Sequence, residues 1–171
     1  MPFVQPLKTQ DAPEKSQPIL KAIEEKFGQS LNIFNTAAYQ PDLLGGMTQI
    51  NDGIRNDLSD KFRELAYYKS SQINACNYCS HYHKQAAKKA GVSDEQLAAI
   101  GDFASSSLFD EQEKAVLSYA QQLTEKSNVD AATVNKLKEF LSDKQLVSLA
   151  GAVALANFTN RFNHGLDIQL P

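Results

Sequence analysis

The sequence predicts an all-α fold, a single-domain bundle of about six to eight helices. Three observations support this prediction. Apolar residues recur at spacings of three and four along most of the chain, and helix-capping residues precede several of these segments. No stretch alternates with period two while showing the β-branched and aromatic enrichment of strands. The 171 residues, 42% of them hydrophobic, can bury one core, so we expect a single domain over residues 1–171.

The first half of the chain predicts three helices after an extended arm at residues 1–17, where prolines gather. Ile19, Ile23 and Phe27 recur at a spacing of four, and Gly28 follows as a C-terminal stop. Pro41 can open a second helix, which weakens at residues 51–53. A third helix is expected from an N-cap at Ser59 to about Ile73. The apolar residues of the second helix are Leu43, Leu44, Met47 and Ile50.

Three later helix starts have a capping residue followed three positions on by Glu or Gln, which can bond back to the cap. These pairs are Ser93 with Gln96, Asp110 with Glu113, and Ser142 with Gln145. The last helix, over residues 146–162, is apolar on nearly all sides. This pattern is typical of a helix buried in the core of a monomer or packed against a second subunit, and it does not distinguish the two.

Composition excludes several classes of function. The net charge of −3 and the lack of a basic stripe argue against a nucleic-acid partner. No segment approaches the roughly 18 uncharged apolar residues that cross a bilayer, and no signal peptide is evident, so we expect no membrane partner and a cytoplasmic protein. The only two cysteines lie three residues apart and cannot link distant parts of the fold, so any chemistry they perform is local.

The segment 63–91 contains both cysteines and two of the three histidines. In a helix that begins near Cys76, the side chains of Cys76, Cys79 and His83 fall within roughly 60° on one face, whereas His81 points to the opposite side. The α-carbons of residues three apart lie about 5–6 Å from each other, a separation at which a disulfide can close. The pair can therefore be oxidised and reduced in place.

The surroundings of the cysteines favour a reactive thiolate. The N–H groups of a helix N-terminus and a nearby imidazole both lower the pKa of a thiol from its ordinary value of about 8.5. Glu64 lies on the preceding predicted helix, on a face with Tyr67 and Tyr68 that we expect to form a half-buried pocket wall. If Glu64 met His83, it could fix the imidazole tautomer and complete a Glu–His–Cys proton relay.

These residues carry a resemblance to a known family. Glu64, Cys76, Cys79 and His83, at these spacings and followed by Gly91, resemble the active-site signature of the alkylhydroperoxidase D-like branch of the carboxymuconolactone decarboxylase superfamily. The residues 41–44 and 58–59 resemble the family's entry to the core, and Asn160-Arg161-Phe162 resembles the closing helix of its peroxidase-related members. The likeness extends over a core of about residues 30–168. Tyr78 stands where the family often has a further histidine.

The resemblance implies a homo-oligomeric helical enzyme, a dimer, trimer or hexamer, without metal, haem or another cofactor. It implies a thiol-dependent peroxidase that reduces organic hydroperoxides or hydrogen peroxide and is re-reduced by a thioredoxin-type or lipoyl-type dithiol donor. By analogy, Cys79 is the peroxidatic thiolate, Cys76 resolves the sulfenic acid as a disulfide, and Glu64 with His83 moves the proton. The helix-terminus argument alone favours Cys76 as the more acidic thiol.

Other interpretations stay open. The same residues could serve a dithiol-disulfide reductase or a redox stress sensor of the superfamily, or remain as a relic in a non-catalytic helical assembly module. Cysteine and histidine at these spacings could also bind zinc, with Glu64 as a further ligand. Asn160 and Arg161 are expected to have a structural use, pairing with or capping another helix.

Overall fold

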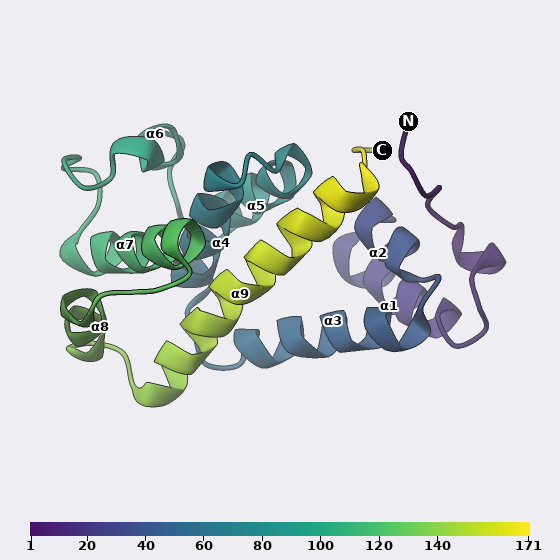
Figure 1. Cartoon of the computed structure of the whole chain (residues 1–171), viewed down its shortest axis with the longest axis horizontal. Helices are drawn as coiled ribbons and strands as arrows, with labels where there is room; N and C mark the ends of the chain where they lie inside the picture. The colour runs from purple at the N-terminus through teal and green to yellow at the C-terminus, as the bar shows by residue number, and fades with distance from the viewer. The chain divides into compact units, whose positions relative to one another are not determined.

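The computed structural model describes residues 1–171 and is built from helices (Figure 1). The α-helices are α1 Gln17–Phe27, α2 Asn32–Ala37, α3 Pro41–Arg55, α4 Asp60–Ile73, α5 Asn77–Lys89, α6 Asp94–Ala98, α7 Glu111–Lys126, α8 Ala131–Lys138 and α9 Asp143–Leu166. Two 3-10 helices, η1 Thr9–Asp11 and η2 Ile100–Asp102, complete the list. The all-α class is confirmed, but nine α-helices exceed the six to eight predicted. The two helices without a predicted counterpart, α2 and α8, span only about two turns or fewer and leave little periodic signal in a sequence.

The chain forms two compact units. One comprises Met1–Asp52 and Arg161–Pro171, and the other comprises Gly53–Asn160. In the first unit the N-terminal arm is held by backbone hydrogen bonds, from Phe3 N–H to the carbonyl of Leu166 at 3.0 Å and from Leu7 N–H to that of Asn35 at 3.3 Å. The second unit contains all four predicted site residues. No helix in the structure is long and apolar enough to cross a membrane.

The central helix of the second unit is α4, which packs against α5 and α7 (Figure 1). Every residue from Arg63 to Ser71 is buried. Tyr68 lies in one hydrophobic cluster with residues of α5, α6 and α7, and Tyr67 lies in another with residues of α9. The expectation of a half-buried wall along α4 is therefore wrong. Since the helix is enclosed, its polar side chains must find partners on neighbouring helices.

The predicted helix boundaries follow local chemistry. Ser59 accepts a hydrogen bond from Phe62 N–H at the start of α4, and Gly28 ends α1 with a φ of 69°. Ser93 and Asp110 form the two capping boxes expected at α6 and α7. Ser142 and Gln145 exchange hydrogen bonds at the start of α9. The four N-terminal caps were predictable because each involves residues only three positions apart, and Gly28 was predictable because glycine favours positive φ.

The turn between α4 and α5 brings the chain to the first cysteine. Asn74 caps α4, and Ala75 then adopts a φ of 52°, in the left-handed region. This conformation allows Cys76 N–H to donate to the carbonyl of Ser71 at 3.0 Å, which closes the end of the helix. A residue with a β-carbon is strained in this region by roughly 1–2 kcal/mol. The turn therefore carries strain directly beside Cys76.

Replacing Ala75 with glycine should raise the free energy of unfolding by about 1 kcal/mol, because glycine adopts positive φ without that strain. Ala90 is a matched control, since it caps α5 with an ordinary φ of −83°. Glycine at Ala90 should destabilise the protein by a few tenths to about 1 kcal/mol. Urea denaturation of both variants would measure the difference. A loss of stability in Ala75→Gly equal to that in Ala90→Gly would contradict the assignment of strain.

Candidate active site

The two cysteines lie at the N-terminus of α5 and face each other. Cys76 is the N-cap, and its Sγ accepts a hydrogen bond from Cys79 N–H at 3.3 Å. The two sulfur atoms are 2.7 Å apart, and both residues are free thiols that are almost fully buried. Because a disulfide bond is about 2.05 Å long, the pair can be oxidised with only a small side-chain movement. The helix N-terminus meanwhile favours negative charge on Cys76.

Glu64 joins α4 to the helix of the cysteines. Its Oε2 lies 2.7 Å from Nδ1 of His83, and its Oε1 accepts from Nε and Nη2 of Arg63 at 3.1 and 3.0 Å. The carboxylate thus assigns one oxygen to each partner. The Arg63 side chain, only 5% exposed, also pairs with Asp60 on the preceding turn of α4. The sequence left open whether α4 and α5 meet at these residues, and the structure brings them together.

The charge state of Glu64 follows from competing influences. Burial alone would raise the pKa of this carboxyl, but the adjacent His83 and the Arg63 guanidinium favour the anion, and together they hold the pKa below its ordinary value. Glu64 is therefore a carboxylate at neutral pH. A carboxylate can only accept hydrogen bonds, so Nδ1 of His83 must carry the proton in this contact. The second ring nitrogen, Nε2, is then the basic atom of the imidazole.

Tyr67 fixes the plane of the His83 ring. The two rings stack with centroids 3.6 Å apart and an angle of 14° between their planes. The Tyr67 hydroxyl lies 2.5 Å from Oγ1 of Thr159, whose own proton is directed to the carbonyls of Leu155 and Ala156 in α9. Since Thr159 has one proton, Tyr67 is the donor between them. The imidazole is thus held by Glu64 at its edge and by Tyr67 on its face.

The phenol of Tyr67 stays protonated near the cysteines. Burial raises the pKa of Tyr67 well above its ordinary value, and negative charge on Cys79 raises it further, followed by smaller contributions from Glu64 and Cys76. The sequence placed Tyr67 on the same helix face as Glu64 but did not indicate that its ring contacts His83. Tyr78 and Tyr82 instead pair with each other, with ring centroids 5.0 Å apart.

The three histidines have different surroundings in the structure. His83 is part of the cluster, whereas His81 is exposed and contacts Gln85 at 2.9 Å. His164 is exposed in α9. Sequence reasoning missed Arg63 and Thr159. The spacing of Asp60 and Arg63, three residues apart on a helix, was a signal for their ion pair, but no local pattern indicates that Thr159 approaches Tyr67.

The ligand set needed for the zinc alternative is not assembled. No group of three or more His, Cys, Asp or Glu side chains in the structure is placed to hold a metal ion. His83 directs Nδ1 to Glu64, as a hydrogen-bonded pair. The geometry thus fits an acid–base pair better than a metal centre.

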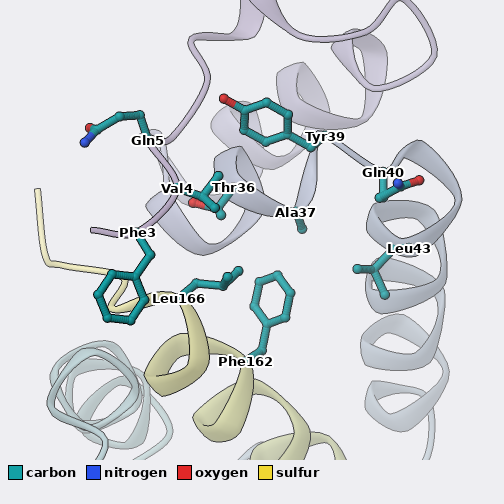
Figure 2. A pocket seen from close by; sticks show the side chains of 10 residues that line it. All are labelled: Phe3, Val4, Gln5, Thr36, Ala37, Tyr39, Gln40, Leu43, Phe162 and Leu166. Carbon is teal, nitrogen blue, oxygen red and sulfur yellow. The ribbon is translucent and has the colours of Figure 1, made fainter. Parts of the chain in front are cut away.

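A separate cavity of about 610 Å³ lies in the unit formed by the chain's two ends (Figure 2). The N-terminal arm, α2 and the end of α9 contribute neutral side chains to it, including Phe3, Phe162 and Leu166. Its one titratable lining residue is Tyr39. The cavity offers no thiol, imidazole or carboxylate.

Comparisons with known proteins place the cluster in a family context. Residues 41–122 match the model of the carboxymuconolactone decarboxylase family, and this segment contains Glu64, both cysteines and His83. The protein YnjA of Escherichia coli (strain K12), which is uncharacterized, is 27% identical over 115 residues. The match covers 67% of this chain and 63% of YnjA, so it spans just under two thirds of that relative's length.

Two solved structures are similar over nearly the whole chain. A cysteine-to-alanine variant of the debrominase Bmp8 in complex with 2,3,4-tribromopyrrole has a TM-score of 0.84 at 23% identity, covering 99% of this chain and 91% of that one. A peroxidase-related protein from Ralstonia eutropha JMP134, described as an alkylhydroperoxidase AhpD core, also has a TM-score of 0.84, at 20% identity, with 99% and 92% covered. Residues 41–122 of this chain are thus similar to the carboxymuconolactone decarboxylase family, and the chain as a whole has the AhpD-like fold.

Proposed function

We propose that the protein is a thiol-dependent peroxidase that reduces organic hydroperoxides or hydrogen peroxide. The observation that supports this best is the arrangement of two thiols 2.7 Å apart on the helix of His83, whose imidazole is held by the buried carboxylate of Glu64. A dithiol of this kind can supply two electrons, and the adjacent base can accept a proton. The AhpD-like fold is compatible with the proposal.

The first step would be attack on the peroxide by Cys79. His83, one helical turn away on the same face, accepts the thiol proton at Nε2. The thiolate attacks the terminal peroxide oxygen, the O–O bond breaks, and Cys79 becomes a sulfenic acid. The alkoxide that leaves takes the proton back from His83 and departs as an alcohol.

In the second step, Cys76 resolves the sulfenic acid. Its thiolate attacks the sulfur of Cys79, the S–O bond breaks, and hydroxide takes up a proton and leaves as water. The sum converts one hydroperoxide and two thiols into one alcohol, one water and one disulfide. A thioredoxin-type or lipoyl-type dithiol then returns two electrons and two protons. The N–H of Cys79 that bonds to Cys76 Sγ favours the thiolate needed for resolution.

The test is to add cumene hydroperoxide to the reduced protein and follow both the peroxide and the mass of the alkylated thiols. We expect consumption of peroxide with formation of a Cys76–Cys79 disulfide. Cys79→Ser should not react, whereas Cys76→Ser should stop at a sulfenic acid that dimedone traps on Cys79. Sulfenic acid on Cys76 in the Cys79→Ser variant would reverse the order of the cysteines, and unreactive thiols in the wild-type protein would refute the redox proposal.

The electron donor decides between turnover and sensing. We expect sustained peroxide consumption with a thioredoxin-type or lipoyl-type donor. A disulfide that forms once and is not re-reduced by either would instead favour a stress sensor. Exchange with protein disulfides in the absence of peroxide turnover would favour a dithiol-disulfide reductase.

A second candidate is reductive debromination, because the structure of the debrominase Bmp8 is similar over 99% of this chain. The same dithiol could convert an aryl bromide to the arene, with bromide and a proton released and a disulfide formed. Release of bromide from 2,3,4-tribromopyrrole, measured beside the peroxide reaction, would decide which electrophile is preferred.

The homo-oligomer stays a prediction, with which the exposed Val147 and Phe158 of α9 are consistent.

A further inference from the structure

The side chain of Asn160 forms hydrogen bonds to residues at both ends of the turn that precedes Cys76. Asn160 lies in α9 and is fully buried. Its Oδ1 accepts a hydrogen bond from Nδ2 of Asn74 at 2.9 Å, and its Nδ2 donates to Oγ of Ser71 at 3.1 Å. Ser71 is the residue whose carbonyl accepts from Cys76 N–H, and Asn74 is the cap of α4. One amide therefore contacts both ends of the last turn before the cysteine.

A wider network supports this amide. Asn74 Nδ2 also donates to Oδ1 of Asn157 at 3.0 Å, and Asn157 Nδ2 donates to Oγ1 of Thr124 in α7 at 3.1 Å. Thr124 donates to Ser70 of α4 at 3.0 Å. Both protons of the Asn74 amide group are thus used, one by each asparagine of α9. The network links three helices at the point where the chain leaves α4.

The turn requires such support because its backbone is strained. Ala75 has a φ of 52° and connects Asn74 to Cys76 without the conformational freedom of glycine. If Asn74 were released, the turn could relax and move Cys76 relative to Cys79, whose position is set by α5. The distance of 2.7 Å between the sulfur atoms depends on keeping both ends of this connection in place.

We propose that Asn160 is a positioning residue for the redox pair: it holds Asn74 and Ser71 so that Cys76 stays in bonding range of Cys79. This inference rests on the proposed dithiol–disulfide chemistry and deepens it. Asn160 does not touch the sulfur atoms through any of these contacts and acts on them through the turn. Its effect should therefore appear in the equilibrium between dithiol and disulfide, and not only in stability.

The test equilibrates each protein with buffers of reduced and oxidised glutathione. In this equilibrium, the Cys76–Cys79 dithiol reacts with one oxidised glutathione and gives the Cys76–Cys79 disulfide and two reduced glutathiones. Thiol alkylation then measures the effective concentration of Cys76 toward Cys79. Leucine is similar in size to asparagine but cannot form the hydrogen bonds to Asn74 and Ser71. We therefore expect Asn160→Leu to lower the effective concentration of Cys76 toward Cys79 by about tenfold or more. Asn35→Leu is the matched control. Asn35 is also buried, lies in the other unit, and donates a hydrogen bond from Nδ2 to the carbonyl of Leu7 at 2.6 Å. The control variant should leave the equilibrium unchanged.

Asn74→Ala provides a milder variant at a half-buried site, in case Asn160→Leu does not fold. It should shift the equilibrium in the same direction. The effect of the double variant should be smaller than the sum of the two single effects, because both residues support the same turn and share the bond between Asn74 and Asn160. An unchanged equilibrium in the folded variants would overturn the role of Asn160. A wild-type protein that forms no disulfide would overturn the proposed function, and this inference with it.

Discussion

Replacing Glu64 with alanine is expected to lower the free energy of unfolding by about 3 kcal/mol or more, because removing one member of a buried ion pair leaves the other without its partner. The Arg63 side chain is 5% exposed and would retain only the contact with Asp60. His83 would lose the acceptor for Nδ1. Chemical denaturation of the reduced protein measures the loss.

Glu64→Gln is the matched control for this prediction. Glutamine keeps the volume of the side chain and one oxygen that can accept from Arg63, so we expect a smaller loss of stability than with alanine. A cost below about 1 kcal/mol for the alanine variant would show that the buried contacts of Glu64 do not stabilise the fold.

The stability that Glu64 contributes should also depend on pH. Its pKa is lowered in the folded protein, so the contribution is fully present above the ordinary carboxyl value of about 4.3 and is lost as the pH falls through the lower folded value. The free energy of unfolding of the wild-type protein should therefore exceed that of Glu64→Gln at neutral pH, and this difference should disappear only in acid. A stability difference that stays constant from neutral pH to pH 3 would contradict the lowered pKa.

Replacing His83 with alanine is expected to slow both thiol alkylation and peroxide turnover. Without the imidazole, the pKa of the reactive thiol should rise, and each unit of rise lowers the thiolate fraction near neutral pH by about tenfold. Loss of a general base should slow peroxide turnover further, by about a hundredfold or more in all. Rates of alkylation by iodoacetamide across pH, followed by peroxide kinetics, separate the two effects.

His81→Ala controls for the loss of any histidine from α5. His81 is exposed and contacts Gln85, so its removal should change neither rate. Unfolding curves must be compared as well, because His83 also stacks on Tyr67. Alkylation in His83→Ala at the wild-type rate would remove His83 from the mechanism.

Much of the secondary structure could be predicted because its causes are local. Ser59, Ser93 and Asp110 cap helices through contacts only three residues away, and Gly28 ends α1 by adopting positive φ. Apolar periodicity then indicates the longer helices. The short α2 and α8 were missed because they contain too few turns for that pattern. Nor could periodicity show that α4 is enclosed on all sides, since several of its buried residues are polar.

The sequence by itself determined that Cys79 and His83 share a face of α5 and that Cys76 precedes them on that side at its N-cap, because helical geometry fixes the relation of residues three, four and seven apart. Only the tertiary structure decided that Glu64 reaches His83, that Arg63 shares the carboxylate, and that Asn160 holds the turn before Cys76. These contacts join residues of different helices, or depend on how α4 is buried, and no spacing along the chain specifies them. The segment from Cys76 to His83 thus supplies the reactive groups. The packing around α4 supplies the partners that orient them.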